Sequence, residues 1–191
     1  MRHIRTLFHG RAVLALLLAL SFVTLAAGPA GAASSSVLDA TCTGGNTTTY
    51  QPGLTNTPAT VTVQGTISMD CVSTDLTTPL LLHGTIAGGG TGTLSCALLQ
   101  SPTSGSSTIV WTTIGGGSYA VSAYDYTTSL SPGTSGTTVL TLTGTVTSGL
   151  YEGDGILLAT VFVNLDLAAC SSPTGLTSRS GAVTAEFSSL L

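Results

Sequence analysis

Charge is scarce in this chain, which has no lysine and in which only 6% of the 191 residues are charged. Soluble domains usually carry about 25% charged residues. Three of the four basic residues, Arg2, Arg5 and Arg11, lie at the N-terminus, and the fourth is Arg179. Without that terminus, one arginine faces eight acidic residues, a net charge of about −7. This excludes nucleic-acid binding through clustered basic side chains and a polybasic anchor on lipid headgroups.

Groups that could carry catalysis or bind a metal are also few. After residue 33 the only histidine is His83, so a Ser–His–Asp hydrolase would have to use it. The nearest match to a nucleophile elbow, at 116–120, lacks the final glycine and lies in a predicted hairpin instead of a strand-to-helix turn. There is no Cys-x-x-Cys pair, so the usual Cys/His zinc ligands are missing. The sequence predicts no catalytic residue, no cofactor and no metal site beyond one weak pair of acids, Glu152 and Asp154.

The first 33 residues have the features of an export signal. Basic residues up to Arg11 precede an apolar run at 12–27, and Ala30-Gly31-Ala32 supplies the small residues that a signal peptidase accepts. The apolar run is short for a membrane span. Cleavage after residue 32 or 33 leaves about 158 residues, the size of one domain. We therefore expect a single secreted, extracellular domain at 34–191 that is not held in a membrane once the signal is removed.

Four cysteines, Cys42, Cys71, Cys96 and Cys170, lie in this domain. An even number of cysteines in an exported chain predicts two disulfides. Three pairings are possible. We favour Cys42–Cys71, which would tie an irregular N-terminal segment to the end of a predicted strand, together with Cys96–Cys170, which would span most of the C-terminal half.

Alternation of apolar and polar residues is the main structural signal in the domain. In 59–71 the apolar residues share one face and Thr, Ser and Gln share the other, a period of two that is typical of a half-buried strand. Gly and Pro clusters separate similar segments. Eight short strands of this kind predict an all-β fold, an antiparallel β-sandwich that is Ig-like in the broad sense. The predicted strands are about 59–71, 80–87, 92–99, 107–114, 118–127, 137–148, 156–167 and 181–188.

The strands at 137–148 and 156–167 are predicted to form a hairpin. Asp154-Gly155 between them is typical of a type I′ turn. Such a turn would expose Glu152 and Asp154 at a solvated tip. The same two acids are the weak candidates for Ca²⁺ ligands, although they fall well short of the roughly six to eight oxygen ligands that this ion takes.

Three aromatic residues, Trp111, Tyr124 and Tyr126, form the most interesting candidate site. The two tyrosines are two positions apart and so share one face of a strand, and Trp111 belongs to a neighbouring predicted strand. Aligned aromatics of this kind could form a flat platform that stacks on sugar rings. The alternative, which we favour, is that Trp111 is core and the other rings stabilise the sheet as cross-strand pairs.

Short turn-like motifs cover nearly all of the chain after residue 40. They are Cys42-x-Gly44, Tyr50-x-Pro52-Gly53-Leu54-Thr55, Cys71, Ser95-Cys96, Trp111, Gly144-Thr145-Val146-x-x-Gly149-Leu150-x-x-Gly153-Asp154, Cys170 and Gly175-Leu176-Thr177. This set resembles a group of small exported proteins of actinobacteria, and the resemblance implies an exported β-sandwich without implying a reaction. The composition also resembles the chromoprotein-type apoproteins of the same bacteria. Their two disulfides close short loops, unlike the long spacings here, so their ligand pocket is not carried over.

Two classes of function follow from these observations. We expect a non-catalytic extracellular module that binds a carbohydrate, a cell-wall component or another protein, because export, disulfides and a strand-rich domain come without a catalytic set. The alternative is a secreted hydrolase that uses His83 or scattered carboxylates. A protease inhibitor is a further alternative, for which the loop at 100–105, shortly after Cys96, is the candidate reactive segment.

Overall fold

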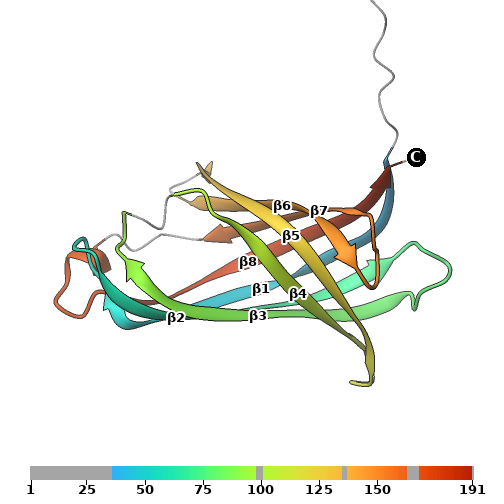
Figure 1. The fold of residues 1–191 in the computed structure, drawn as a ribbon, viewed down its shortest axis with the longest axis horizontal. Helices are drawn as coiled ribbons and strands as arrows, with labels where there is room; N and C mark the ends of the chain where they lie inside the picture. The colour runs from blue at the N-terminus through green and yellow to red at the C-terminus, as the bar shows by residue number, and fades with distance from the viewer. Residues whose placement is uncertain (1–35, 98–100, 135–136, 163–167, 191) are drawn as a thin grey trace, which may run out of the picture. The chain divides into compact units, whose positions relative to one another are not determined.

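The computed structural model describes residues 36–97, 101–134, 137–162 and 168–190, so the predicted export signal at 1–33 lies outside the described residues. The described chain is almost entirely β-structure (Figure 1). No helix in these ranges is long and apolar enough to cross a membrane. The strands are β1 (Ser36–Leu54), β2 (Ala59–Ser73), β3 (Leu81–Leu94), β4 (Ser104–Thr113), β5 (Ser118–Pro132), β6 (Thr138–Ser148), β7 (Gly155–Phe162) and β8 (Leu176–Leu190), with a short 3₁₀ helix, η3 (Ala169–Ser171), before β8.

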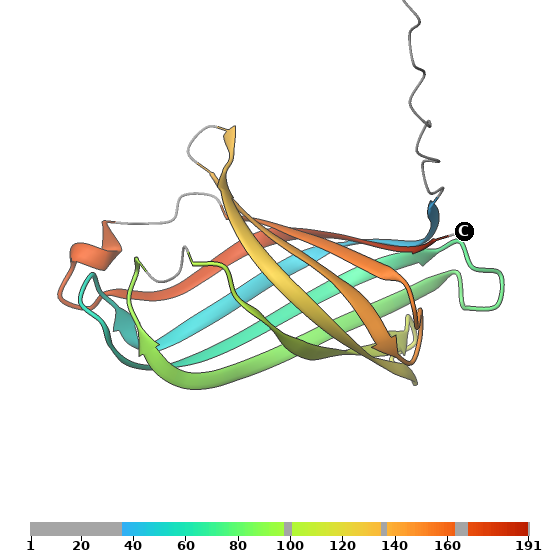
Figure 2. The same ribbon diagram turned by 45° about the horizontal axis from the view of Figure 1, so that its top comes forward.

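The strands form one closed antiparallel barrel, so the prediction of a β-sandwich is wrong. Each strand pairs with the next along the chain, and β8 returns to pair with β1 (Figures 1 and 2). The seam depends on β1, which pairs with β2 over residues 40–51 and with β8 over 36–54. Sequence reasoning treated the start of this segment as irregular. With β1 added, the two ends of the sheet meet, because one strand hydrogen-bonds to both.

A second correction concerns β3, which was predicted as two strands at 80–87 and 92–99. The structure has one strand, and its pairing with β2 continues without a break from Leu81 to Leu94 through the three glycines at 88–90. Glycine weakens a strand because it has no side chain to pack. Here β2 supplies a continuous ladder of partners that holds the glycines extended.

The larger of two clusters of buried side chains fills the part of the barrel interior around Trp111. At its centre lies Trp111, fully buried, with its ring centroid 5.7 Å from that of Tyr151 and 5.5 Å from that of Phe187, both in edge-on contact. Its indole Nε1 donates a hydrogen bond to Ser122 Oγ at 2.9 Å, and Ser122 Oγ donates to the carbonyl of Leu150 at 2.6 Å. The buried indole therefore has its partner, as a polar group in an apolar core requires.

The two disulfides are Cys42–Cys71 and Cys96–Cys170, the pairing favoured from the sequence. The first joins direct cross-strand neighbours on β1 and β2. The second joins the residues after β3 to η3, and both of its cysteines lie in a small apolar cluster with Tyr50, Leu54 and Leu176. Disulfides of this kind are typical of oxidising, extracellular environments.

The barrel opens between β3 and β4. These two strands pair only where residues 82–85 face 110–113, whereas β2 and β3 pair over 14 residue pairs. Beyond this short contact the two strands diverge (Figure 2). Residues 86–94 of β3 and 104–109 of β4 are therefore not paired with each other, and residues of both segments, among them Gly88 and Ser107, line one pocket. We call this unpaired gap the slot.

Candidate functional site

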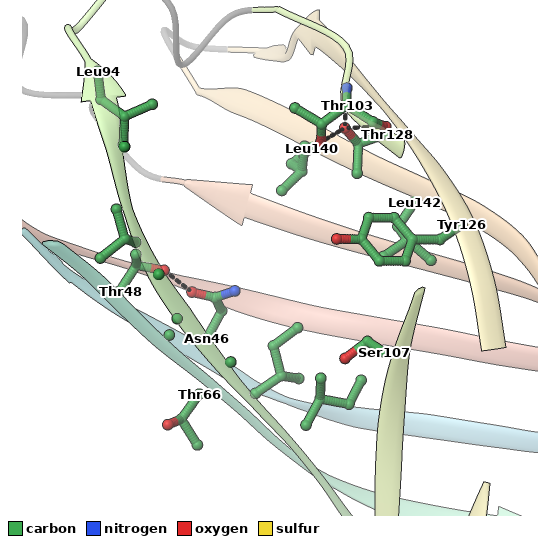
Figure 3. Close-up of a pocket in the computed structure, with 18 of the residues that line it drawn as sticks. Asn46, Thr48, Thr66, Leu94, Thr103, Ser107, Tyr126, Thr128, Leu140 and Leu142 are labelled. Atoms are coloured by element: carbon green, nitrogen blue, oxygen red, sulfur yellow. Dashed lines mark hydrogen bonds between the residues drawn. The ribbon is translucent and has the colours of Figure 1, made fainter. Parts of the chain in front are cut away.

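A cavity of about 470 Å³ lies beside this slot (Figure 3). Its volume falls within the range of roughly 300–1,000 Å³ that is typical of small-molecule sites. Most of its wall is apolar, with a few hydroxyl and amide groups among the apolar side chains. The apolar side chains that line it include Val63, Ile67, Ile86, Leu94, Leu140 and Leu142.

Between Ile86 and Leu94, the wall that β3 contributes consists mostly of glycine. After Ile86 its next inward positions are Gly88, Gly90 and Gly92, which follow the alternation that buries Leu82, Gly84 and Ile86. A Cβ atom added at any of the three glycines would meet no atom within 4 Å. The space therefore exists because these three positions lack side chains in a part of the barrel that neighbouring residues do not fill.

Polar groups reach the cavity from two sides. On β1, Thr48 Oγ1 donates a hydrogen bond to Asn46 Oδ1 at 3.0 Å, and the amide nitrogen of Asn46 points away from Thr48 (Figure 3). On the opposite wall the half-buried Tyr126 of β5 directs its hydroxyl toward the open space (Figure 3). At the rim the Oγ1 atoms of Thr103 and Thr128 are 2.8 Å apart. These groups could orient a bound molecule without making the site strongly polar.

Arg179 of β8 faces the interior next to this cavity. Its cross-strand partner on β1 is Thr48, which lines the cavity. The guanidinium carbon lies 4.4 Å from the ring centroid of Phe162 and 6.0 Å from that of Tyr50, the first within cation–π distance. Arg179 Nε and Nη1 and the Tyr50 hydroxyl are buried without a hydrogen-bond partner. Burial raises the pKa of Tyr50, and the positive charge of Arg179 opposes that rise.

Sequence reasoning missed Arg179 as a site residue. The available signal was its position, because it is the only basic residue after the N-terminal segment and it shares the alternation of Val183, Ala185 and Phe187 on β8. A cation at an inward position of a strand in an acidic chain is unusual, since charged residues are rarely buried unless paired.

The three predicted platform aromatics divide between the two halves of the barrel. Trp111 and Tyr124 are buried, with 0% and 2% of their surface exposed, so they do not present a platform to solvent. Trp111 belongs to the packed core. Tyr124 and Tyr126, with ring centroids 5.8 Å apart, both line the cavity. The aromatic pair thus faces the cavity.

The acids at the β6–β7 turn do not form the exposed tip that was predicted. β6 and β7 do pair as a hairpin, but positive φ values occur at Gly149, Tyr151 and Gly153, so the turn is longer than a two-residue type I′ turn. Glu152 is exposed, whereas Asp154 is only 6% exposed. Desolvation raises the pKa of Asp154 to about 6, and the neighbouring Asp39 and Asp75 add to this rise. Within the described ranges, no group of three or more His, Cys, Asp or Glu residues could hold a metal ion.

His83 lies in a hydrogen-bonded row on the outer face of the barrel. Its Nδ1 is 2.8 Å from Asp70 Oδ1 and its Nε2 is 3.2 Å from Ser68 Oγ. This is the order of groups in a serine hydrolase triad. The row forms because Ser68 and Asp70 share the outer face of β2 and His83 is the β3 partner of Asp70. All three residues lie in strands that are paired on both sides, so their main-chain N–H groups serve the sheet instead of an oxyanion hole.

The segment at 100–105, the candidate inhibitor loop, is only partly described, because Gln100 lies outside the described residues. Ser104 and Gly105 begin β4 and pair with β5. The Thr103 main-chain N–H donates to Thr128 Oγ1 at 3.0 Å. The described part of this segment is thus bound to the barrel instead of standing out as a reactive loop.

No protein-family model matches the chain, and neither does any curated protein or solved structure.

Proposed function

We propose that this is an exported, non-catalytic binding protein that holds a small, mostly apolar molecule inside its barrel. The observation that carries this proposal is the cavity whose β3 wall includes Gly88, Gly90 and Gly92, between Ile86 and Leu94. Protein interiors are normally close-packed, and an open apolar space of this size is typical of a ligand site. The slot between β3 and β4 supplies the access route.

The chemistry of the wall favours a less polar ligand than a polysaccharide. Each CH₂ group that a ligand buries against such a wall contributes about 0.8 kcal/mol. The few polar groups, chiefly Asn46 and Tyr126, would fix the orientation of the ligand. This differs from the carbohydrate, cell-wall or protein partner expected from the sequence, because the aromatic residues on which a sugar platform would depend lie inside the barrel.

A cavity-filling substitution tests this proposal. The neutral fluorescent probe 1-aminoanthracene is titrated into the native protein, Gly90→Leu and the matched control Gly45→Leu, which adds the same side chain on the outer face of β1. We expect Gly90→Leu to weaken binding by roughly tenfold or more, because the leucine occupies the ligand space, and Gly45→Leu to bind like the native protein. Equal binding by all three folded proteins, or no binding by the native one, would rule out the cavity as the site.

The Ser68–His83–Asp70 row supports a second candidate, a secreted hydrolase. Proton transfer by a positioned histidine contributes typically 10²–10⁴-fold to a rate. If the row is catalytic, Ser68→Ala and His83→Gln will each lower the rate of p-nitrophenyl acetate hydrolysis by about that factor, and a fluorophosphonate will label Ser68. The proposed binding function instead expects the same slow rate from the native protein and both variants, with no label on Ser68.

A further inference from the structure

Arg179 is half-buried, and its positive charge has no counter-charge among the described residues. Its Nε and Nη1 make no hydrogen bond, and the only ion pair in the described part of the chain joins His83 and Asp70 on the outer face. Phe162 and Tyr50 offer the guanidinium ring faces, which do not replace a hydrogen-bond acceptor. A charged group in an apolar interior is costly unless a counter-charge pairs with it. The site therefore favours an anion.

Two strands that line the cavity flank this charge. On one side Arg179 pairs with Thr48 of β1. On the other side the guanidinium lies over Phe162 of β7, and β7 pairs with β6 so that Thr160 faces Leu140, another residue of the cavity wall. The Thr160 hydroxyl is also buried without a partner. The unpaired polar atoms of Tyr50, Thr160 and Arg179 thus belong to β1, β7 and β8, which are paired with one another or with the cavity-lining strand β6.

We propose that the ligand of the cavity is an amphipathic organic acid, whose carboxylate binds Arg179 and whose apolar tail lies along the glycine wall of β3. This inference rests on the proposed binding function and adds the class of ligand. The tail would contact Ile86, Leu140 and Leu142. The carboxylate would accept hydrogen bonds from the guanidinium and from Tyr50, whose raised pKa keeps its hydroxyl protonated as a donor.

Charge balance favours a carboxylate over a phosphate. Guanidinium groups bind both anions well. One arginine neutralises one negative charge, whereas a phosphate monoester carries roughly −1.5 to −2 near neutral pH. The excess charge would remain in a protein that is already acidic. A monoanionic head is therefore the better match.

The experiment compares head groups on one tail. Dodecanoate, dodecanol and monododecyl phosphate each displace 1-aminoanthracene from the native protein, from Arg179→Met and from the charge-conserving Arg179→Lys at pH 8. We expect the native protein to bind dodecanoate about 10- to 100-fold more tightly than dodecanol, as for a hydrogen bond to a charged group. Arg179→Met loses this preference but keeps its affinity for dodecanol, because methionine retains the apolar part of the side chain. Arg179→Lys keeps part of the preference.

The outcomes separate this inference from the proposed function. Equal affinity of the native protein for dodecanoate and dodecanol overturns the carboxylate assignment and leaves the binding function intact, as does a preference that persists in Arg179→Met. Tighter binding of monododecyl phosphate than of dodecanoate overturns the choice of head group. If the native protein binds none of the three compounds, both proposals fail.

One further variant tests whether the chain supplies its own counter-charge. Asp166 lies outside the described residues. If Asp166→Asn creates a preference for dodecanoate that the native protein lacks, the guanidinium is neutralised from within and the inference is wrong. We expect Asp166→Asn to leave the native preference unchanged.

Discussion

Asp154 couples the stability of the barrel to pH. Its pKa is raised from 3.8 to about 6, first by burial and then by Asp39 and Asp75. The folded protein therefore holds this proton more tightly than the unfolded chain does. The resulting stabilisation is fully present below about pH 4 and is lost as the pH rises through about 6.

We expect Asp154→Asn to remove this loss. Melting temperatures of the native protein and the variant, measured from pH 3.5 to 7.5, should be similar at the acid end, and the variant should be the more stable above pH 7. Glu152→Gln, an exposed acid in the same turn, is the matched control and should follow the native curve. A variant curve parallel to the native one across this range would show that Asp154 does not carry the effect.

Ser122 connects the single tryptophan to the backbone of a turn. It accepts from Trp111 Nε1 and donates to the Leu150 carbonyl. Ser122→Ala leaves both groups buried without this partner, so we expect it to lower the free energy of unfolding by about 1–3 kcal/mol. Urea denaturation followed by Trp111 fluorescence measures this change. Ser129→Ala, at an exposed position of the same strand, should change stability by less than about 0.5 kcal/mol, and equal effects of the two substitutions would contradict the assignment.

At the scale of elements, the two disulfides constrain different kinds of contact. Cys42–Cys71 joins neighbouring strands that already pair along their length. Cys96–Cys170 closes a sequence separation of 74 residues, against 29 for the first, and anchors segments that no strand ladder holds. Chain entropy assigns about 3.6 kcal/mol to the shorter loop and about 4.4 kcal/mol to the longer one.

We therefore expect the Cys96→Ala/Cys170→Ala double variant to lose more stability than Cys42→Ala/Cys71→Ala. Urea denaturation of both double variants in parallel with the native protein gives the comparison. The order of the two losses is the test, and a larger loss from the strand-to-strand disulfide would show that it does more than repeat the constraint of the ladder.

The sequence pattern did not predict β1 or the full length of β3, because both strands lack apolar side chains at their inward positions beside the cavity. A period of two is visible only where inward positions are apolar. On β1 the inward positions at 44, 46 and 48 are Gly, Asn and Thr. Gly44 is required there because a Cβ would lie 2.0 Å from the carbonyl oxygen of Ser68. On β3 the inward glycines that leave the cavity empty look like a turn in the sequence. The glycine and polar residues that line the cavity thus interrupt the apolar–polar alternation from which β1 and β3 could have been predicted.

The strands that pack against the filled half were predicted well for the converse reason. β2, β4 and β6 alternate because their inward side chains, such as Met69, Trp111 and Val146, are buried in the main core. The candidate site itself could not be derived in this way. Its components come from strands far apart in the chain, and the contact of Arg179 with Phe162 depends on the pairing of β7 with β8.

At the scale of the whole barrel, the seam and the slot should differ in their dynamics. The β1 amides at 40–49 lie between two paired strands, whereas β3 beyond Thr85 pairs only with β2 among the described residues. Every second amide of 86–94 therefore points toward the slot. Protection against hydrogen exchange reflects the free energy of opening.

We expect these alternate β3 amides to exchange much faster than the β1 amides, and to slow when a ligand fills the cavity. Hydrogen exchange followed by NMR, with and without 1-aminoanthracene, measures both effects. Uniform protection of β3 and β1 in the free protein would show that the barrel is closed on all sides in solution. The Gly90→Leu variant serves as the control, since it should show little response to the probe.

The amino-acid pattern alone was enough to predict that the domain is built of antiparallel strands, that its four cysteines suit an oxidising environment, and that clustered basic surfaces are excluded. These properties follow from local alternation and composition, which need no long-range information. The closure of the sheet became evident only from the three-dimensional structure. Closure depends on the pairing of β1 with β8, whose register joins Ser36 to Leu190, nearly the whole domain apart. That same pairing places Arg179 beside Thr48. The cavity next to the three glycines of β3 likewise forms only when all the strands that surround it are in place.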